Sequence, residues 1–307
     1  MRVKVLGSAA GGGFPQWNCA CTNCSRLRQG TLKGKARSQI QLAVGQDDRW
    51  ALLDASPDLR LQLESSPELT PKPSLEGQSR NTPIDSAVLT CAELDRVLGV
   101  LQLREFQPFT IYVTESVRRV LTEDNTMFRM LHRLEKQVTW QPMTPEKSFE
   151  LLHGLRCLPF ALPARYPEYV SFERGSQLTA NEASVGLEIE STASGRRMLY
   201  LPSLPQIDDG MMTRMANCDL LFVDGTFWEN DELVRVRGNG RSAREMGHIP
   251  ISGPDGSLEK LRSMSRPKKI YIHINNTNPL LDKASAAFRE VKKSGMTVAE
   301  DDMEFEL

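Results

Sequence analysis

The stretch from Ala87 to Glu105 constrains the fold most, because it predicts an apolar strand, a short polar turn and an amphipathic helix in direct succession. The strand is expected at Ala87 to Leu89 and the turn at Thr90 to Asp95. The helix is predicted from apolar residues that recur mostly at spacings of three and four, namely Leu94, Val97, Leu98, Leu101 and Leu103. In a protein of alternating strands and helices, functional side chains collect where strands end. Four such side chains are expected at this strand end: Thr90, Cys91, Glu93 and Asp95.

Two later strands are expected to deliver polar side chains in the same way. The apolar run Leu220 to Thr226 contains Asp224 near its end, and the strand Lys269 to Ile274 delivers His273. Strands and helices alternate along the chain without a convincing linker. A length of 307 residues is compatible with two domains or with one large α/β domain. We therefore expect a single α/β domain over residues 1–307.

Composition narrows the class of partner. Hydrophobic residues make up 40% and charged residues 25% of the chain, which is ordinary for a soluble globular protein. With 38 basic and 39 acidic residues, the net charge of -1 gives no electrostatic case for binding nucleic acid or an anionic membrane surface. No apolar run approaches the length of a membrane span, and the N-terminal apolar run breaks into glycines too early for a secretory signal. We expect a cytoplasmic protein, without membrane insertion, that binds a small molecule or another protein.

Three cysteines crowd into one short segment. Cys19, Cys21 and Cys24 place three thiols within six residues. Thiolates this close suit a tetrahedral ion such as zinc, with a fourth ligand from elsewhere in the chain. Three unpaired cysteines are the alternative. We expect the fourth ligand to come from the segment His273 to Asn278, where His273 is the strong donor, although His273 is also a candidate for the active site.

Histidine is scarce, with four in the chain, and two of the four follow Gly-rich or strand-end segments. Together with Asp95 and Asp224, His248 and His273 give two imidazoles and two carboxylates. Such a set can hold one Fe(II) or Zn(II) ion, or perform acid–base chemistry without a metal. The alternative for Asp95 is a favourable acid in the first turn of a helix.

Five motifs in this order resemble the metallo-β-lactamase superfamily and, more closely, its members that act in the biosynthesis of pyrroloquinoline quinone (PQQ). The motifs are GSAAGGGFPQWNCACTNC, LTCAELDRVLG, FVDGT, MGHIPISGPDGS and IHINNTNP. The resemblance implies a four-layer αββα sandwich and a structural zinc held by Cys19, Cys21 and Cys24. It also implies an Fe(II)-dependent hydroxylase acting on a tyrosine-derived quinone precursor, or alternatively a protein that moves the quinone or its precursor toward the periplasm.

The chain departs from the superfamily's metal motif, His-x-His-x-Asp-His. Cys91, Glu93, Asp95 and Arg96 stand at its four positions, whereas the PQQ proteins typically keep the final Asp-His pair. A guanidinium has no lone pair to offer a metal. An iron site would have to use Asp95, Asp224 and His273 without this ligand, or not form.

Two hypotheses therefore stay open. In the first, the chain is an enzyme whose catalytic residues are Asp95, His248 and Asp224. In the second, it is a binding or carrier protein. In either case Arg96, Cys91 and Glu93 are expected to contact the substrate, since an arginine pairs well with the carboxylates of a quinone precursor. The segment from Pro163 to Ala183 is expected to cover the pocket, and a homodimer is a further option.

Overall fold

The computed structural model describes residues 1–73, 79–105, 107–133, 135 and 137–307. Contacts divide the chain into two compact units. Unit 1 comprises Met1–Gly7, Gln41–Gly195 and Asp302–Leu307, and unit 2 comprises Ser8–Ile40 and Arg196–Asp301. The expectation of one domain over residues 1–307 stays a prediction, because this division does not test independent folding.

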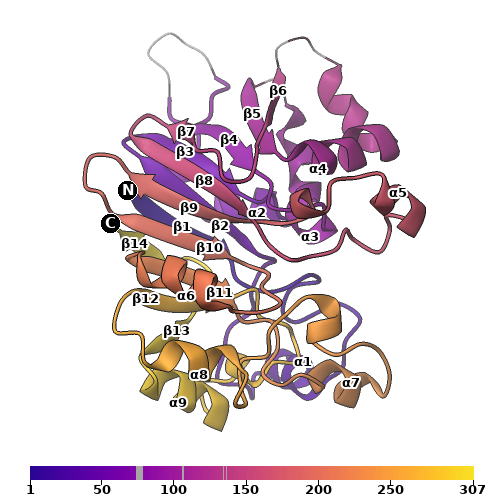
Figure 1. Cartoon of the computed structure of the whole chain (residues 1–307), viewed down its shortest axis with the longest axis vertical. Helices are drawn as coiled ribbons and strands as arrows, with labels where there is room; N and C mark the ends of the chain where they lie inside the picture. The colour runs from indigo at the N-terminus through magenta and orange to yellow at the C-terminus, as the bar shows by residue number, and fades with distance from the viewer. Residues whose placement is uncertain (74–78, 106, 134, 136) are drawn as a thin grey trace. The chain divides into compact units, whose positions relative to one another are not determined.

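Unit 1 contains a mixed seven-stranded sheet in the order β14-β1-β2-β3-β4-β5-β6. Its strands are β1 (Arg2–Gly7), β2 (Gln41–Gln46), β3 (Arg49–Leu53), β4 (Ile84–Val88), β5 (Phe109–Val113), β6 (Val138–Pro142) and β14 (Glu304–Glu306). Neighbours from β14 to β3 are antiparallel, and those from β3 to β6 are parallel. The two chain ends meet at the β1–β14 edge, where the Met1 amino group donates to the Leu307 carbonyl oxygen at 2.9 Å (Figure 1).

Helical segments connect the parallel strands of this sheet, because parallel neighbours need crossover connections. They are α2 (Leu59–Glu64), η1 (Pro67–Leu69), α3 (Leu94–Val97), η2 (Leu98–Arg104), α4 (Glu115–Arg119), η3 (Val120–Asp124) and η4 (Thr126–His132). Unit 1 also holds an antiparallel ladder and two further short helices: β7 (Phe149–Leu152), β8 (Leu155–Ala161), β9 (Val185–Ser191), α5 (Phe172–Ser176) and η5 (Ala180–Glu182).

The helix predicted after the central strand is wrong in type over most of its length. Only one α-helical turn forms, α3, and the chain then continues as the 3-10 helix η2. Two contacts explain the change. The Ala55 N–H donates a hydrogen bond to the carbonyl oxygen of Arg96 at 2.6 Å. In a continuing α-helix this oxygen would instead accept from an N–H of the helix four residues later. Gly99 approaches so closely that a Cβ would lie 2.2 Å from the Ser56 carbonyl oxygen. Leu94 is 49% exposed, so it does not belong to the buried face.

The segment from Pro163 to Ala183 belongs to unit 1 and packs against other parts of this unit. Tyr169 donates its hydroxyl to the carbonyl oxygen of Ala92, next to Cys91. Leu178 is buried in a core cluster that includes Leu89 and Ala92. The segment therefore lies over the end of β4, and its role as a cover for a ligand stays a prediction.

Unit 2 is built on the parallel ladder β10-β11-β12-β13. Its strands are β10 (Arg197–Leu201), β11 (Leu220–Asp224), β12 (Lys268–Ile272) and β13 (Met296–Val298). Its helices are α1 (Thr22–Arg28), α6 (Asp209–Ala216), α7 (Glu232–Arg237), η6 (Arg244–Met246), α8 (Ser257–Arg262), η7 (Pro279–Leu281) and α9 (Ala286–Lys293). Helix α9 packs beside β13 (Figure 1).

The glycine-rich segment after β1 runs beside the end of β12 in unit 2. Ala10 donates its N–H to the Ile274 carbonyl oxygen at 3.0 Å, and Ile274 donates to the Ser8 carbonyl oxygen at 2.9 Å. Gly12 and Gly13 take φ values of 92° and 69°, a region that glycine enters freely. The turn they make leads the chain toward the three cysteines. Within the described residues, every helix is too short or too polar to cross a bilayer.

Candidate functional site

Two neighbouring parallel strands of unit 2 present the first cluster of candidate residues. Asp224 ends β11 and is paired with Ile272, which ends β12. His273 follows directly with a φ of 62°, in the left-handed region that histidine tolerates better than most residues. His248 arrives from the segment after η6, behind Gly247, whose φ is 83°. Strand register and two left-handed residues thus bring one carboxylate and two imidazoles together.

Thr226 connects these three side chains. Its hydroxyl group donates to Asp224 Oδ1 at 2.6 Å. The hydroxyl oxygen, Thr226 Oγ1, also lies 2.7 Å from His273 Nδ1 and 3.1 Å from His248 Nδ1. His248 Nδ1 lies 2.7 Å from Asp224 Oδ2, and the two rings stack with centroids 5.3 Å apart. The single hydroxyl hydrogen goes to Asp224, so both Nδ1 atoms act as donors. That tautomer places the lone pair of each imidazole on Nε2.

Asp224 is fully buried and accepts four hydrogen bonds. Its other two donors are the backbone N–H groups of Leu204 and Thr226, at 2.8 and 3.0 Å. Burial alone would raise the pKa of Asp224, but the charge and hydrogen bond of His248, with His273 and Thr226, outweigh it and hold the pKa below its ordinary value. The group is therefore a carboxylate at neutral pH.

The chemistry of this donor set fits a divalent first-row metal ion. Asp224, His248 and His273 offer ligand atoms that all lie within 4.8 Å of one another. Two imidazoles and one carboxylate are typical of non-haem Fe(II) sites, and Zn(II) accepts them as well. Metal-bound histidines commonly donate their second ring N–H to a carboxylate, as His248 does to Asp224. In this arrangement Asp224 orients His248, and direct ligation by Asp224 would require that hydrogen bond to be exchanged.

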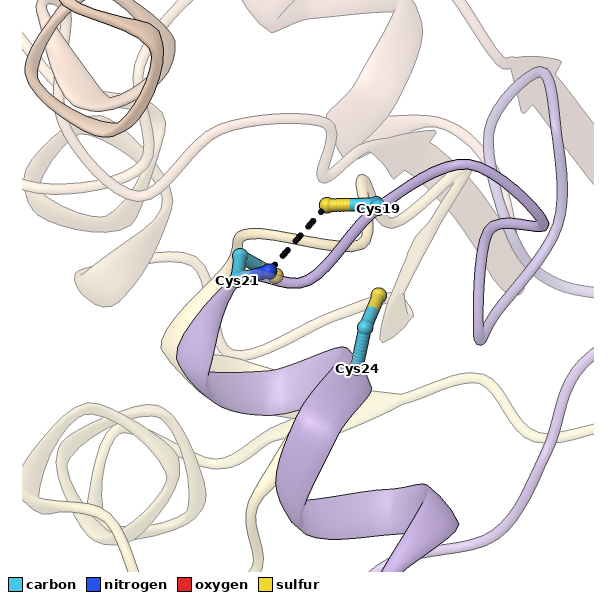
Figure 2. Close-up of side chains that lie close together, drawn as sticks. All are labelled: Cys19, Cys21 and Cys24. Atoms are coloured by element: carbon cyan, nitrogen blue, oxygen red, sulfur yellow. Dashed lines mark hydrogen bonds between the residues drawn. The ribbon is translucent and has the colours of Figure 1, made fainter.

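The three cysteines form the second cluster of unit 2. Their Sγ atoms lie within 4.8 Å of one another, and Figure 2 shows Cys19 and Cys21 before helix α1 and Cys24 on it. Burial opposes ionisation of Cys19, but hydrogen bonds from Cys21, Cys24 and Asn276 lower the pKa of its thiol. Burial raises the pKa of Cys21 to about 11. Three adjacent thiols cannot all ionise without a cation. A zinc ion suits such sulfur ligands, so the residues fit it.

The segment expected to supply the fourth zinc ligand does contact the thiols, through Asn276. Its Nδ2 lies 3.1 Å from Cys19 Sγ, 3.6 Å from Cys21 Sγ and 3.4 Å from Cys24 Sγ. His273 is grouped instead with Asp224 and His248. Of the two roles considered for His273, zinc ligand beside the cysteines or active-site residue, the position of its ring in the carboxylate–imidazole cluster favours the second.

The residues predicted at the end of β4 all lie in unit 1. Arg96 is 2% exposed, and its Nη1 lies 3.4 Å from Thr90 Oγ1 and 3.6 Å from Cys91 Sγ. Thr90 in turn donates to Asp54 Oδ1 at 2.7 Å. Burial raises the pKa of Cys91 to about 12, although Arg96 opposes this, so Cys91 is a neutral thiol. The guanidinium is thus held inside the fold by its neighbours.

Glu93 is exposed and Asp95 is half-buried. Their assignments, to substrate contact and catalysis, stay predictions. Thr226 and Asn276 were not singled out from the sequence. A signal existed for each, because Thr226 follows Asp224 by two residues and Asn276 lies in the segment predicted to reach the cysteines.

Comparison with known proteins places this geometry in a family. A model described as the beta-lactamase superfamily domain matches residues 49–274. The coenzyme PQQ synthesis protein B of Pseudomonas entomophila is 42% identical, with 100% of both chains covered, and that of Nitrosococcus oceani is 39% identical, with 99% of both covered.

Among solved structures, Zn(2+)-bound PqqB from Methylobacterium extorquens matches with a TM-score of 0.91 and 35% identity over 100% of both chains. A diphosphatase of the PhnP family matches at 20% identity with a TM-score of 0.66, covering 100% of this chain and 97% of that one, which shows a shared fold. The predicted α/β sandwich of metallo-β-lactamase type is confirmed. The chain belongs to the coenzyme PQQ synthesis protein B family of the beta-lactamase superfamily.

Proposed function

We propose that this chain acts in PQQ synthesis as an Fe(II)-dependent hydroxylase of a tyrosine-derived quinone precursor. The observation that carries the proposal is the cluster of Asp224, His248 and His273, which gives the donor set typical of non-haem iron enzymes once Asp224 exchanges its hydrogen bond with His248 for the metal. The name of the relatives supports the pathway. Zinc in the Methylobacterium extorquens protein supports a metal-binding member of the same family.

The chain's own residues would hold and orient the reaction centre. His248 and His273 are held through Nδ1, so that each ring presents Nε2 in a fixed direction. Asp224 keeps His248 Nδ1 protonated, and burial of Asp224 and His273 keeps bulk water from these hydrogen bonds. Bound iron would supply the activation of dioxygen. One oxygen atom would enter the substrate, and the other would leave as water after taking two electrons from an added reductant and two protons from solvent.

Anaerobic reconstitution with Fe(II) tests this proposal. We expect one iron per chain at the imidazole cluster and, with a tyrosine-derived precursor, dioxygen and ascorbate, a product that has gained one oxygen atom. Isotopically labelled dioxygen should place its label in that product. His273→Ala should lose both iron and turnover, whereas the matched control His153→Ala should keep both, since His153 is almost fully exposed. Equal iron binding and turnover by the two variants would refute the proposal.

A carrier function is the second candidate, and Arg96 favours it. This position carries a metal-ligating histidine in the superfamily motif, whereas here it carries a buried cation. A carrier should bind PQQ or its precursor without iron, with an affinity that iron does not change. Calorimetric titration of metal-free and iron-loaded protein separates the two functions, because a hydroxylase should bind its precursor more tightly in the iron-loaded form.

We also propose a cytoplasmic location and a small-molecule quinone precursor as partner, without nucleic acid or membrane insertion. The nearly neutral net charge supports this choice of partner. A homodimer stays an option, which light scattering of the purified protein would test.

A further inference from the structure

The side-chain amide of Asn276 lies where the fourth ligand of a tetrahedral ion bound by the three thiols would be. A zinc ion binds sulfur at about 2.3 Å and oxygen at about 2.1 Å, so the sulfur–oxygen edges of its tetrahedron are about 3.6 Å long. The end of the Asn276 amide lies 3.1, 3.6 and 3.4 Å from the Sγ atoms of Cys19, Cys21 and Cys24. These distances resemble tetrahedral edges, and the Asn276 residue is 5% exposed.

The neighbours of Asn276 are committed to other contacts. Asn275 Nδ2 donates to Thr277 Oγ1 at 2.6 Å, and Thr277 Oγ1 donates to Glu232 Oε1 at 2.5 Å. Asn278 Nδ2 donates to the carbonyl oxygen of Gly225 at 2.9 Å. Among residues 275–278, Asn276 is thus the one whose side chain faces the sulfurs.

The amide of Asn276 can serve both forms of the cluster. With protonated thiols, its NH₂ group donates to sulfur, as the distances show. Rotating the amide by half a turn exchanges nitrogen and oxygen, which places Oδ1 at the same corner. An amide oxygen is a neutral ligand, so three thiolates and Asn276 would leave the zinc site with a single negative charge.

The cluster is also fastened to the loop that follows His273. Asn23 lies on helix α1 between Cys21 and Cys24, and its Nδ2 donates to the carbonyl oxygens of Asn276 and Asn278 at 3.2 and 2.9 Å. Asn278 continues the connection to β11 through Gly225. Movement of the thiol segment would therefore be transmitted to the ends of β11 and β12, which carry Asp224 and His273.

We propose that Asn276 is the fourth ligand of a zinc ion held by Cys19, Cys21 and Cys24, and that this zinc clamps the loop that follows His273. The inference goes beyond the proposed reaction, because it assigns a ligand and a positioning role outside the carboxylate–imidazole cluster. It holds for a hydroxylase and for a carrier alike.

Zinc affinity and cobalt spectroscopy test the proposal without any activity assay. Co(II) bound to thiolates gives a charge-transfer band that the imidazole cluster cannot produce, so titration of this band reports the thiol site alone. Asn276→Ala should weaken Co(II) and Zn(II) binding there by about 10- to 100-fold, the range seen when a supporting group of a metal site is removed. Asn276→Asp should bind at least as tightly as the unchanged protein, because a carboxylate oxygen is an established zinc ligand. Asn275→Ala is the matched control and should leave the affinity unchanged.

The dependence on metal separates ligation from ordinary packing. Asn276→Ala should lower the Tm of the zinc-loaded protein, and the difference should largely vanish after chelation. An equal loss of Tm with and without zinc would overturn the proposal, as would an Asn276→Ala variant with unchanged affinity. If Asn276→Ala does not fold, Asn276→Asp decides the matter, since loss of its zinc would equally overturn the assignment.

Discussion

We expect the buried carboxyl group of Glu232 to make the free energy of unfolding depend on pH near neutrality. The residue begins helix α7, is 7% exposed, and accepts hydrogen bonds from Thr277 Oγ1 at 2.5 Å and from the Trp228 N–H at 2.6 Å. Burial raises its pKa from 4.5 to about 7, and the two hydrogen bonds only partly oppose this. At 1.36 kcal/mol per pKa unit, this shift corresponds to a change of about 3 kcal/mol in the free energy of unfolding between low and high pH.

The direction of the effect follows from where the proton is held. Below pH 4.5 the carboxyl group is protonated in both the folded and the unfolded chain. Between 4.5 and about 7 only the folded chain keeps the proton, so the free energy of unfolding falls as the pH rises. Above that interval both states are ionised and the loss is complete. About 2 of the 3 kcal/mol should be lost between about pH 5.5 and about pH 8.5.

Urea unfolding at several pH values measures this loss. Glu232→Gln has no proton to lose, so the difference in unfolding free energy between the unchanged protein and this variant should shrink by about 2 kcal/mol over that range. Glu259→Gln is the control, because its side chain is 55% exposed and should leave the slope unchanged. Parallel pH profiles for the unchanged protein and Glu232→Gln would refute the reasoning.

Three further predictions concern the metal cluster and the turn after β4. Thr226→Val removes the hydroxyl that holds His273 and should weaken iron binding by about 10- to 100-fold, measured by competition with a chelator; unchanged affinity would contradict the orienting role. Arg96→His restores the imidazole of the superfamily motif and should raise the iron content of the purified protein and its turnover. If the unchanged protein already holds one iron per chain and turns over as fast as Arg96→His, Arg96 does not weaken iron binding and the prediction is wrong. Gly99→Ala forces a Cβ against the Ser56 carbonyl oxygen and should destabilise the fold by about 2 kcal/mol in urea unfolding, where a change within error would show that the backbone yields.

Strand ends could be predicted from the sequence because an apolar run followed by a polar side chain is a local signal. Asp224 and His273 were both expected at strand ends, and the parallel register of β11 and β12 sets them side by side. His248 has no such strand, and its Gly-rich context was the available signal. The family motifs supplied the fold class, because individual segments do not specify how sheets and helices are layered.

The helix after β4 shows what a local pattern misses. Its leucine spacing is helical, but the carbonyl oxygen of Arg96 bonds to Ala55, about forty residues earlier in the chain, and Gly99 packs onto Ser56. Tertiary contacts override helical periodicity in such cases. Strand β14 was missed for a related reason. Its short acidic sequence becomes a strand by pairing with β1, where Glu304 meets Lys4 at 3.0 Å.

The left-handed backbone at His273 restricts which metals the imidazole cluster could be redesigned to hold. With a φ of 62°, this position accepts histidine, asparagine and aspartate more readily than other side chains, and it disfavours bulky or branched ones. Aspartate would give a harder, oxygen-rich site suited to Mn(II) or Mg(II). Cysteine, which would draw the site toward copper(I), has no comparable tolerance for this conformation. The backbone conformation at position 273 therefore limits which ligand side chains can stand there, and through them which metals the site can bind.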